Sequence, residues 1–282
     1  MTKNISAVII DTYEDKKLAT LAIEMTLKCK KVNKVYTFSD KPYFEGAEFN
    51  EIPSISSIKD YEKVVLRNLK NIVHENFLLI QWDGFVLYPS KWQDIFLEYD
   101  YIGAPVFLNN NYIVGNGGFS YRSNRLMNAI ARIQDTNREH DYDLPEDILI
   151  CSQYRTELEK QGIKFAPLEV ASKFSFETDS YPSDLQNLFG FHSPWGFAIF
   201  FDEKKILPYT SDIIKRIGKF ASLVVYLEQC QKRGRHQLLL ESIISMNKFS
   251  HIIHMIDKNL SSNDNIFWAK RFIEVTKTLV KY

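Results

Sequence analysis

Apolar residues come in unbroken runs, separated by amphipathic segments, along the first third of the chain. Ile5–Ile10 and Phe77–Ile80 are apolar at almost every position, which is typical of strands covered on both faces of a sheet. Two shorter apolar runs lie between them. Residues 13–30 and 58–73 instead place apolar side chains at helical spacing. The pattern predicts an α/β fold with a mostly parallel, three-layer sheet.

The pattern is less regular after the central run. Residues 101–105 have the composition of a strand that Pro105 closes, because proline lacks the N–H that a strand needs. Residues 144–160 are typical of a helix, with a proline early and two acids in the first turn. We expect residues 164–177 to form one or two strands.

The last quarter of the chain differs from the rest in pattern and in charge. From about Ser211 onward the apolar spacing is wholly helical, which predicts two domains, residues 1–207 and 208–282. Basic and acidic side chains number 35 each overall, but residues 206–282 hold 12 basic against six acidic ones. The overall charge therefore gives no indication of nucleic acid binding. The basic extension indicates a surface for anionic lipid or for a partner.

Cysteine content and hydropathy bear on the compartment. Cys29, Cys151 and Cys230 are odd in number and far apart, which favours a reducing cytoplasm over a disulfide framework or a zinc site. No run reaches the roughly 18 apolar residues of a membrane-spanning helix.

Residues 213–220 interleave basic and apolar side chains, as an interfacial helix does. The alternative is an amphipathic helix packed on its own domain with a solvated basic face.

The central apolar run ends abruptly in Gln81, Trp82, Asp83 and Gly84. Ligands of open α/β sheets bind in the crevice beyond the carboxyl ends of the strands, so a carboxylate there can meet a metal or a sugar hydroxyl. Asp83 and Gly84 are also typical turn residues before a following strand. Both interpretations remain open from this segment alone.

Three further features could carry chemistry, and each has a structural alternative. The glycine loop, residues 115–118, permits close approach of a ligand, yet glycines most often serve a tight turn. Glu146 and Asp147 could simply complement the dipole of the helix that they open. His192, in a segment dense in aromatic residues and glycine, could be a packed, hydrogen-bonded side chain.

Taken in order, these features resemble the parts of GT-A-type glycosyltransferases, and most closely a glycosyltransferase-like family. The shared motifs are Gln-x-Asp at 81–83, Tyr-Asp-Tyr-Ile-Gly-Ala-Pro at 99–105, Gly-Asn-Gly-Gly-Phe-Ser at 115–120, Glu-Asp at 146–147 and Gly-x-His at 190–192. The resemblance covers roughly residues 5–200. It implies a GT-A-like (Rossmann-like) mixed sheet flanked by helices, followed by the C-terminal helical extension.

The same resemblance implies a metal site with one departure from the usual pattern. In GT-A enzymes an Asp-x-Asp motif and a late histidine hold a divalent cation on the nucleotide diphosphate. Asp83 and His192 match the second aspartate and the histidine, but Gln81 replaces the first aspartate. A neutral amide is a poorer ligand for Mn²⁺ or Mg²⁺, so metal dependence stays open. Without a metal, Lys63, Arg67 or Arg122 could neutralise the diphosphate.

The resemblance also assigns roles in catalysis and binding. It makes Asp147, or failing that Glu146, the general base of an inverting transfer. It places the glycine loop between donor and acceptor, and Trp195 could stack on an acceptor sugar. The implied donor-binding residues are Asp11, Thr12, Asp40, Lys63, Arg67, Gln81 and Asp83, and the loop residues are Gly115, Asn116, Gly117 and Gly118.

These roles predict a hexosyltransferase of bacterial type that acts in polysaccharide biosynthesis. Its partners would be a nucleotide-sugar donor and a glycan or lipid-linked glycan acceptor. We expect a cytoplasmic protein that contacts the inner face of the membrane, if at all, through its basic C-terminal helices. The alternatives are a non-catalytic module that binds carbohydrate or nucleotide, which Gln81 favours, and a helical scaffold protein.

Overall fold

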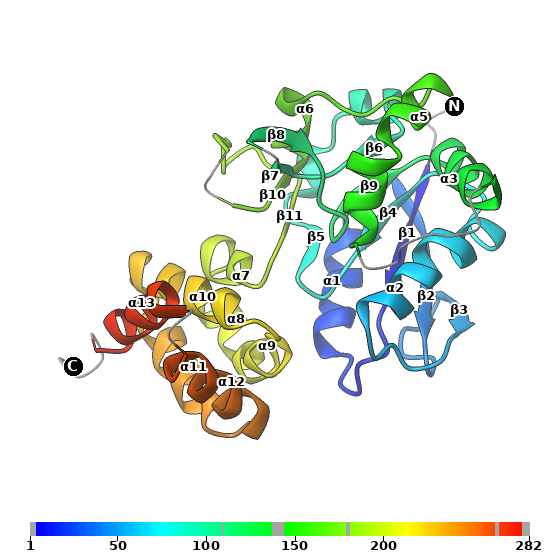
Figure 1. Cartoon of the computed structure of the whole chain (residues 1–282). Coiled ribbons are helices and arrows are strands. Elements are labelled where there is room, and N and C mark those ends of the chain that lie inside the picture. Colours follow the sequence, from blue (N-terminus) through cyan, green and yellow to red (C-terminus); the bar gives the residue numbers. More distant parts are fainter. Residues whose placement is uncertain (1–3, 109, 137–143, 179–180, 263–264, 278–282) are drawn as a thin grey trace. The chain divides into compact units, whose positions relative to one another are not determined.

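The computed structural model describes residues 4–108, 110–136, 144–178, 181–262 and 265–277 (Figure 1). The chain forms two compact units, Met1–His192 and Ser193–Tyr282, and each is described by itself. The predicted boundary between domains lay after residue 207. The two units are defined by packing alone and do not test where a domain ends. The predicted boundary after residue 207 therefore stays a prediction.

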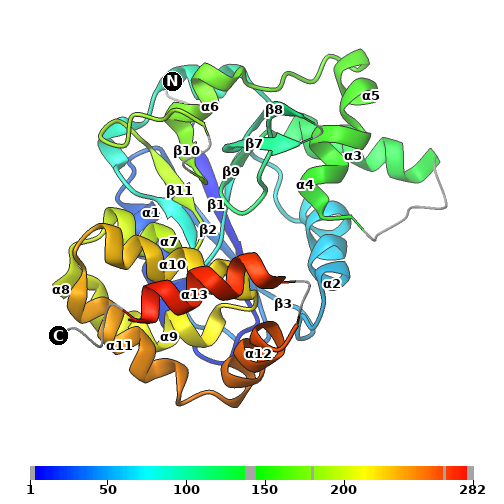
Figure 2. The same ribbon diagram turned by 60° about the vertical axis from the view of Figure 1, so that its left-hand side comes forward.

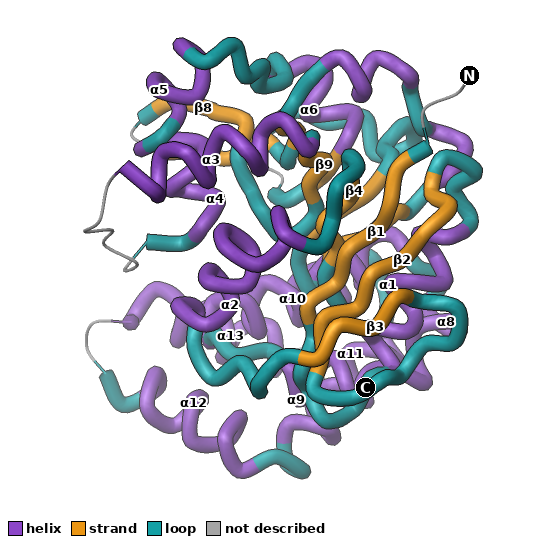
Figure 3. The backbone as a smooth tube through the Cα atoms, turned by 90° about the vertical axis from the view of Figure 1, so that its right-hand side faces the viewer, coloured by secondary structure: helices purple, strands orange, loops and turns teal. Residues whose placement is uncertain are grey.

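A six-stranded sheet forms the centre of the first unit. Its order is β3-β2-β1-β4-β9-β6, and the first five of these strands are labelled in Figure 3. The first four of these strands pair in parallel, whereas β9 pairs antiparallel with both β4 and β6. The strands are β1 (Ile5–Ile10), β2 (Val32–Ser39), β3 (Glu48–Glu51), β4 (Phe77–Ile80), β6 (Tyr101–Ile102) and β9 (Ser120–Arg122). The predicted mostly parallel sheet is confirmed.

Helices cover both faces of this sheet, so β1 and β4 are buried along their whole length. Figure 3 shows α1 (Lys17–Leu27) behind the strands, and α2 (Ile58–Lys63) and α3 (Asn124–Thr136) in front of them. The chain steps from β1 to β2 in one direction but returns from β3 to β4 on the other side of β1. Since such crossovers are right-handed, this reversal puts the connecting helices on opposite faces. It also makes the carboxyl ends of β1 and β4 the place where ligands bind in open sheets.

The helical run after α2 changes geometry without a break. A π-helical turn, Val64–Asn68, and a 3₁₀ turn, Leu69–Asn71, continue it, so the predicted helix 58–73 is confirmed in extent. The second predicted helix behaves similarly: α4 (Glu146–Ile148) continues through a π-helical turn, Leu149–Gln153, and α5 (Arg155–Lys160) follows.

Two small sheets flank the central one. A three-stranded sheet has the order β10-β11-β5, and β7 pairs with β8 as a hairpin. The strands are β5 (Gly84–Val86), β7 (Pro105–Leu108), β8 (Asn111–Val114), β10 (Ser175–Phe176) and β11 (Gly190–His192). Because β5 pairs antiparallel with β11, His192 lies directly opposite Gly84. Short 3₁₀ turns, Pro89–Lys91 and Asp94–Glu98, follow β5.

Two expectations about strands need correction. Residues 164–177 were expected to form one or two strands, and β10 is one such strand, but Leu168–Phe174 before it forms the helix α6. Ala171 and Phe174, three positions apart, are the buried residues of α6, which is a helical spacing. Pro105 does not close a strand, because β6 ends at Ile102 and Pro105 begins β7. The first position of a strand tolerates proline.

The second unit is helical over its described residues (Figures 1 and 2), as predicted for the C-terminal region. A 3₁₀ turn, Leu207–Tyr209, precedes α9. Gly234, at φ +65°, ends α10, because a left-handed residue closes a helix with little strain when it is glycine. The helices are α7 (Trp195–Phe200), α8 (Glu203–Ile206), α9 (Thr210–Arg216), α10 (Phe220–Lys232), α11 (His236–Met246), α12 (Ser250–Leu260) and α13 (Ile266–Lys277).

The amphipathic stretch 213–220 turns its apolar side chains into the second unit. Ile213, Ile214 and Ile217 are at most 1% exposed, and Phe220 is 5% exposed. These side chains are not available to a lipid surface, so the alternative of a helix packed on its own domain is what the structure shows. Across the described residues, no helix combines the length and the apolar character needed to cross a membrane.

Candidate active site

The carboxyl ends of β1 and β2 carry three of the predicted donor-binding residues. Lys16 joins two of them, since its Nζ donates to the backbone oxygen of Asp11 at 2.7 Å and to Asp40 Oδ1 at 3.0 Å. The bond from Lys16 is the main cause that lowers the pKa of Asp40. Thr12 Oγ1 accepts a hydrogen bond from the Ile55 backbone at 2.8 Å. These contacts hold the loops after the two strands in one place.

The end of β4 is a tight turn that presents Asp83. Gln81 and Gly84 exchange backbone hydrogen bonds of 2.7 and 3.1 Å, so Trp82 and Asp83 form the tip of the turn. Both interpretations of this segment therefore hold: Asp83 is a turn residue, and it lies at the carboxyl end of a buried strand. Its carboxylate is 3.8 Å from His192 Nε2.

His192 lies at the centre of a cluster that we call the histidine cluster, which consists of Gln81, Asp83, Glu177 and His192. Nε2 of His192 is 3.2 Å from Gln81 Oε1, and Nδ1 is 2.7 Å from Glu177 Oε2. Gln81 is oriented by Tyr61, whose hydroxyl accepts from Gln81 Nε2 at 2.8 Å. The imidazole thus has acidic or amide oxygens at both ring nitrogens.

Opposing effects set the charge of His192. Burial by itself lowers the pKa of the imidazole, because a cation loses solvation. The carboxylates of Glu177 and Asp83 outweigh burial and raise the pKa to about 9. The two carboxylates therefore favour the protonated form of His192.

The glycine loop is shaped by the side chains around it rather than by left-handed glycines. Its residue with positive φ is Asn116, at +59°. The Asn116 side chain accepts from the Gly118 backbone at 3.1 Å, and Tyr101 donates to the Asn116 carbonyl at 3.0 Å. A Cβ atom on Gly118 would lie 2.1 Å from His192 Nε2, and one on Gly117 would lie 2.1 Å from Glu146 Oε1. The two glycines are needed because functional side chains occupy that space.

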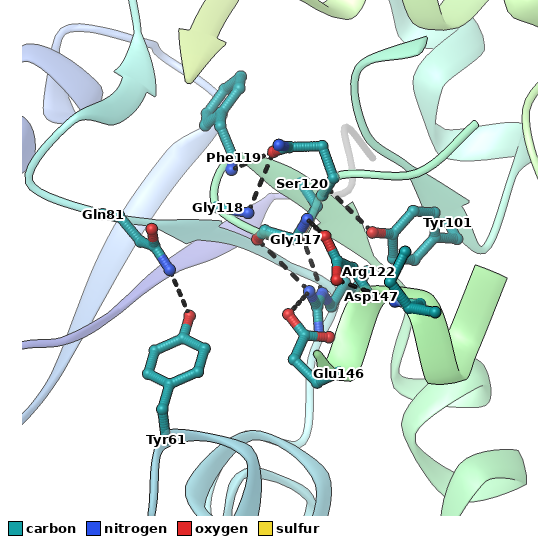
Figure 4. Close-up of polar contacts among 12 residues, drawn as sticks. Tyr61, Gln81, Tyr101, Gly117, Gly118, Phe119, Ser120, Arg122, Glu146 and Asp147 are labelled. Carbon is teal, nitrogen blue, oxygen red and sulfur yellow. Dashed lines mark hydrogen bonds and ion pairs between the residues drawn. The ribbon is translucent and has the colours of Figure 1, made fainter. Parts of the chain in front are cut away.

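A second cluster, the arginine cluster of Arg122, Glu146 and Asp147, lies beside Gly117 of the loop (Figure 4). Arg122 Nη2 and Glu146 Oε1 form an ion pair of 2.8 Å, and the two side chains are 0% and 5% exposed. Arg122 also donates to Ser120 Oγ at 2.9 Å. Burial raises the pKa of the Glu146 carboxyl, and the positive charge of Arg122 counteracts that rise. Glu146 is thus enclosed and paired.

Asp147 differs from its neighbour in contacts and in exposure. Its Oδ2 accepts from the Gly117 backbone at 2.9 Å, and its Oδ1 accepts from the Ile148 backbone at 2.9 Å. The side chain is half-buried rather than buried. Asp147 is therefore a carboxylate fixed by two backbone N–H groups at the edge of the glycine loop.

Residues 45–196 match a protein family described as "Protein of unknown function (DUF5672)". The chain belongs to this family. The match spans both clusters and the glycine loop, whereas Asp11, Thr12 and Asp40 precede it. No curated protein matched the chain.

Two solved structures share part of the fold of this DUF5672 chain. One is a glycosyltransferase involved in the glycosylation of the major capsid of PBCV-1, 10% identical, with a TM-score of 0.45 over 67% of this chain and 92% of the other. The second is the bifunctional IspDF from Campylobacter jejuni, 11% identical, with a TM-score of 0.36 over 58% of this chain and 48% of the other. TM-scores below 0.5 mark a partial likeness that carries no functional argument.

The predicted cationic residues of the DUF5672 chain are not equally placed to meet a ligand. Arg122 is completely buried against Glu146. Lys63 and Arg67 are exposed, and they follow Tyr61 by two and six positions, which turns them to another side of their helix from the residue that contacts Gln81. Trp195 begins α7 in the second unit, and its acceptor role stays a prediction.

Sequence reasoning missed two residues: Glu177, which belongs to the histidine cluster, and Tyr61, which orients Gln81. Glu177 follows β10 in a stretch that was expected to be a strand, so nothing marked it as a neighbour of His192. Tyr61 lay on a predicted amphipathic helix, where an aromatic residue is usually packing material. Neither contact can be read from the sequence alone, because each joins segments that are far apart in the chain.

The histidine cluster offers only part of the ligand set that a divalent cation needs. Among the residues that the structure describes, no group of three or more His, Cys, Asp or Glu side chains is arranged to hold a metal. The donors on the Nε2 side of His192 are the Asp83 carboxylate and the Gln81 amide oxygen. Glu177 bonds the other ring nitrogen, as carboxylates behind metal-bound histidines do. Mg²⁺-type ions are often held by few side chains plus phosphate oxygens, which suits this set.

Proposed function

We propose that the first unit is a glycosyltransferase that moves a sugar from a nucleotide-sugar donor to a glycan or lipid-linked glycan acceptor, with inversion. One observation carries the proposal: four motifs distant in sequence form one connected cluster. His192 contacts Gln81 and Asp83 at one end, and Asn116 Nδ2 lies 3.0 Å from its Nδ1. The next loop residue, Gly117, donates to Asp147. If the motifs form one active site, as the resemblance implies, they must converge in this way. Unrelated turns would have no reason to converge.

The position of the cluster supports a donor site. Asp11 follows β1 and Gln81 follows β4, and these adjacent strands flank the point where the strand order reverses. A nucleotide would lie against Asp11, Thr12 and Asp40, with its diphosphate toward Asp83 and His192. A bound divalent cation would offset negative charge on that diphosphate.

Asp147 is the proposed general base. In an inverting transfer its carboxylate accepts the proton of the acceptor hydroxyl while the hydroxyl oxygen bonds the anomeric carbon. The bond from that carbon to the diphosphate breaks, and the diphosphate leaves with the electron pair. The Gly117 and Ile148 N–H groups hold Asp147 in position for this step. Glu146 is excluded from contact with an acceptor in this arrangement because Arg122 and burial enclose it.

A non-catalytic binding module is the second candidate, and Gln81 favours it. The Gln81 amide is bonded to Tyr61 and lies against His192, so it is part of the scaffold of the cluster. A site with an amide in place of a carboxylate has less negative charge to hold a divalent cation.

Release of nucleoside diphosphate from nucleotide sugars separates the two candidates. The full chain is incubated with UDP-, GDP- and dTDP-linked hexoses, with and without MnCl₂, and released nucleotide is measured by an enzyme-coupled assay. A transferase releases nucleoside diphosphate from one donor class, by slow hydrolysis without an acceptor or faster with one. Tight binding without release from any donor would support the binding module instead.

A further inference from the structure

A pocket of about 540 Å³ is lined entirely by residues of the second unit. It lies between the segment that opens α10, one side of α12 and the start of α13. None of the residues discussed for the candidate active site contributes to it. Its chemically informative lining residues are Lys219, His251, His254, Lys258 and Trp268.

The lining of this pocket is basic and contains no described acidic side chain. Lys219 and Lys258 are exposed, and neither takes part in an ion pair with any residue that the structure describes. Like charges that share a concave surface repel one another, and a bound anion turns that repulsion into attraction. The charge pattern therefore indicates an anionic ligand.

The basic residues of α12 are arranged on one side of the helix. His251, His254 and Lys258 follow one another at intervals of three and four positions, which stacks them along a single face. His251 is held by a contact of 3.0 Å between its Nε2 and the backbone oxygen of Lys215. The exposed apolar residues Ile253 and Leu260 fall on the other side of α12, so they do not extend the pocket.

Trp268 gives the pocket a fixed aromatic wall. The Arg271 guanidinium carbon lies 4.6 Å from the centre of its ring, and Arg271 Nε donates to Glu228 Oε1 at 2.6 Å. Cation–π contact and the ion pair with α10 together restrict the indole. Flat aromatic surfaces of this kind favour the apolar face of a sugar ring.

We propose that this pocket binds a phosphate ester on a polyhydroxylated ring. Lys219 and Lys258 pair with phosphate oxygens, the ring N–H groups of the histidines donate to phosphate or hydroxyl oxygens, and Trp268 stacks on the ring. A soluble sugar phosphate and an inositol phospholipid headgroup share this chemistry. The site is independent of the transfer reaction proposed for the first unit.

The test follows Trp268 directly, so that phosphate binding elsewhere in the chain does not interfere. The full chain has four tryptophans, so its ¹⁵N-labelled form gives four indole N–H resonances in an NMR spectrum. The resonance that is missing from the spectrum of the Trp268→Phe variant is that of Trp268. Glucose 1-phosphate is titrated in, with glucose as the uncharged control. We expect a saturable shift of the Trp268 resonance with glucose 1-phosphate and none with glucose.

Lysine variants provide the control for charge. The Lys219→Gln/Lys258→Gln protein should bind glucose 1-phosphate at least tenfold more weakly, while Lys270→Gln, an exposed change on α13 outside the pocket lining, should leave Kd unchanged. Thermal melting confirms that each variant is folded, and Lys258→Gln alone replaces the double variant if that one is not. An unchanged Kd in the folded lysine variants would overturn the proposal.

A second arm separates the two sources of the ligand. Flotation with phosphatidylcholine vesicles is compared with flotation after addition of phosphatidylinositol. Saturation by glucose 1-phosphate alone indicates a soluble ligand, and inositol-lipid-dependent flotation lost in the lysine variants indicates the headgroup. No Trp268 shift together with no such flotation would contradict the pocket as a phosphate-ester site.

Discussion

The two clusters beside the glycine loop differ in the exposure of their charged side chains. In the arginine cluster, Arg122 and Glu146 neutralise each other with side chains that are 0% and 5% exposed. In the histidine cluster, the His192 and Glu177 side chains keep 19% and 15% of their exposure. A sealed ion pair can position its neighbours, whereas a partly exposed one can also meet a ligand. Burial thus distinguishes a sealed cluster from a partly exposed one.

Asp147 is the partly exposed member of the arginine cluster, bonded to the Gly117 backbone, and its removal gives the largest expected effect on turnover. Asp147→Asn keeps the shape of the side chain but removes the base, so transfer should fall by about 10³-fold. The donor Kd should stay within about twofold, since Asp147 acts on the acceptor. Steady-state transfer and calorimetry measure the two quantities, and normal turnover would remove Asp147 as the base.

Breaking the sealed pair should act on stability. Glu146→Gln leaves the Arg122 charge buried without its partner, which lowers the free energy of unfolding by about 3 kcal/mol. The matched control is Glu159→Gln, because Glu159 pairs with Arg155 on the surface and its loss costs less than about 1 kcal/mol. Urea unfolding compares the two variants. Equal losses would mean that the arginine cluster is not sealed.

The histidine cluster can be displaced without changing any of its charges. A Cβ atom on Gly118 would overlap His192 Nε2, so Gly118→Ala should push the imidazole aside and destabilise the chain by about 2 kcal/mol. Gly218→Ala is the control, since nothing lies within 4 Å of its Cβ position. The His192 ring resonances should move in the first variant and stay in place in the control.

Asp100, in the shared stretch at residues 99–105, gives the smallest effect and a pH dependence. Burial raises the pKa of its carboxyl. Hydrogen bonds from Arg125 and Ser123 lower this pKa by a larger amount, so the net shift is downward. A carboxyl with a lowered native pKa stabilises the fold above its unfolded pKa of about 3.9, and this contribution is lost as pH falls through the native value.

Asp100→Asn should therefore cost about 1 kcal/mol at neutral pH, from weakened hydrogen bonds. It should also flatten the loss of stability in acid. Urea unfolding at a series of pH values down to the acid transition measures both. A variant whose acid transition coincides with that of the parent chain would show that Asp100 does not contribute.

The centre of the parallel sheet was predictable because β1 and β4 are apolar runs covered on both faces, a pattern that the residues carry locally. The helix α6 was not, since it is only seven residues long and its helical spacing rests on two buried residues, Ala171 and Phe174. Gln81, Asp83, Asp147 and His192 were found from motif order. Glu177 was not, because a contact across β10 and β11 leaves no mark in either segment.

The loop shows the limit of reasoning from residue types. Glycines 115, 117 and 118 suggested conformational freedom, yet Asn116 holds the left-handed position and the glycines at 117 and 118 leave room for Glu146 and His192. Which explanation applies depends on side chains contributed by other segments. Sequence alone therefore predicts that the loop matters but not why.

The central claim is that the clustered motifs form one nucleotide-sugar site, and calorimetric titration with nucleoside diphosphates tests it most directly. UDP, GDP and dTDP are titrated into the full chain and into Asp83→Ala, with and without MnCl₂, and with Asp94→Ala as a surface control. We predict that one nucleotide binds and that Asp83→Ala alone weakens it by about tenfold, or about 1.4 kcal/mol. A folded chain that binds none of them, or binds one with the same Kd after Asp83→Ala, would contradict the claim.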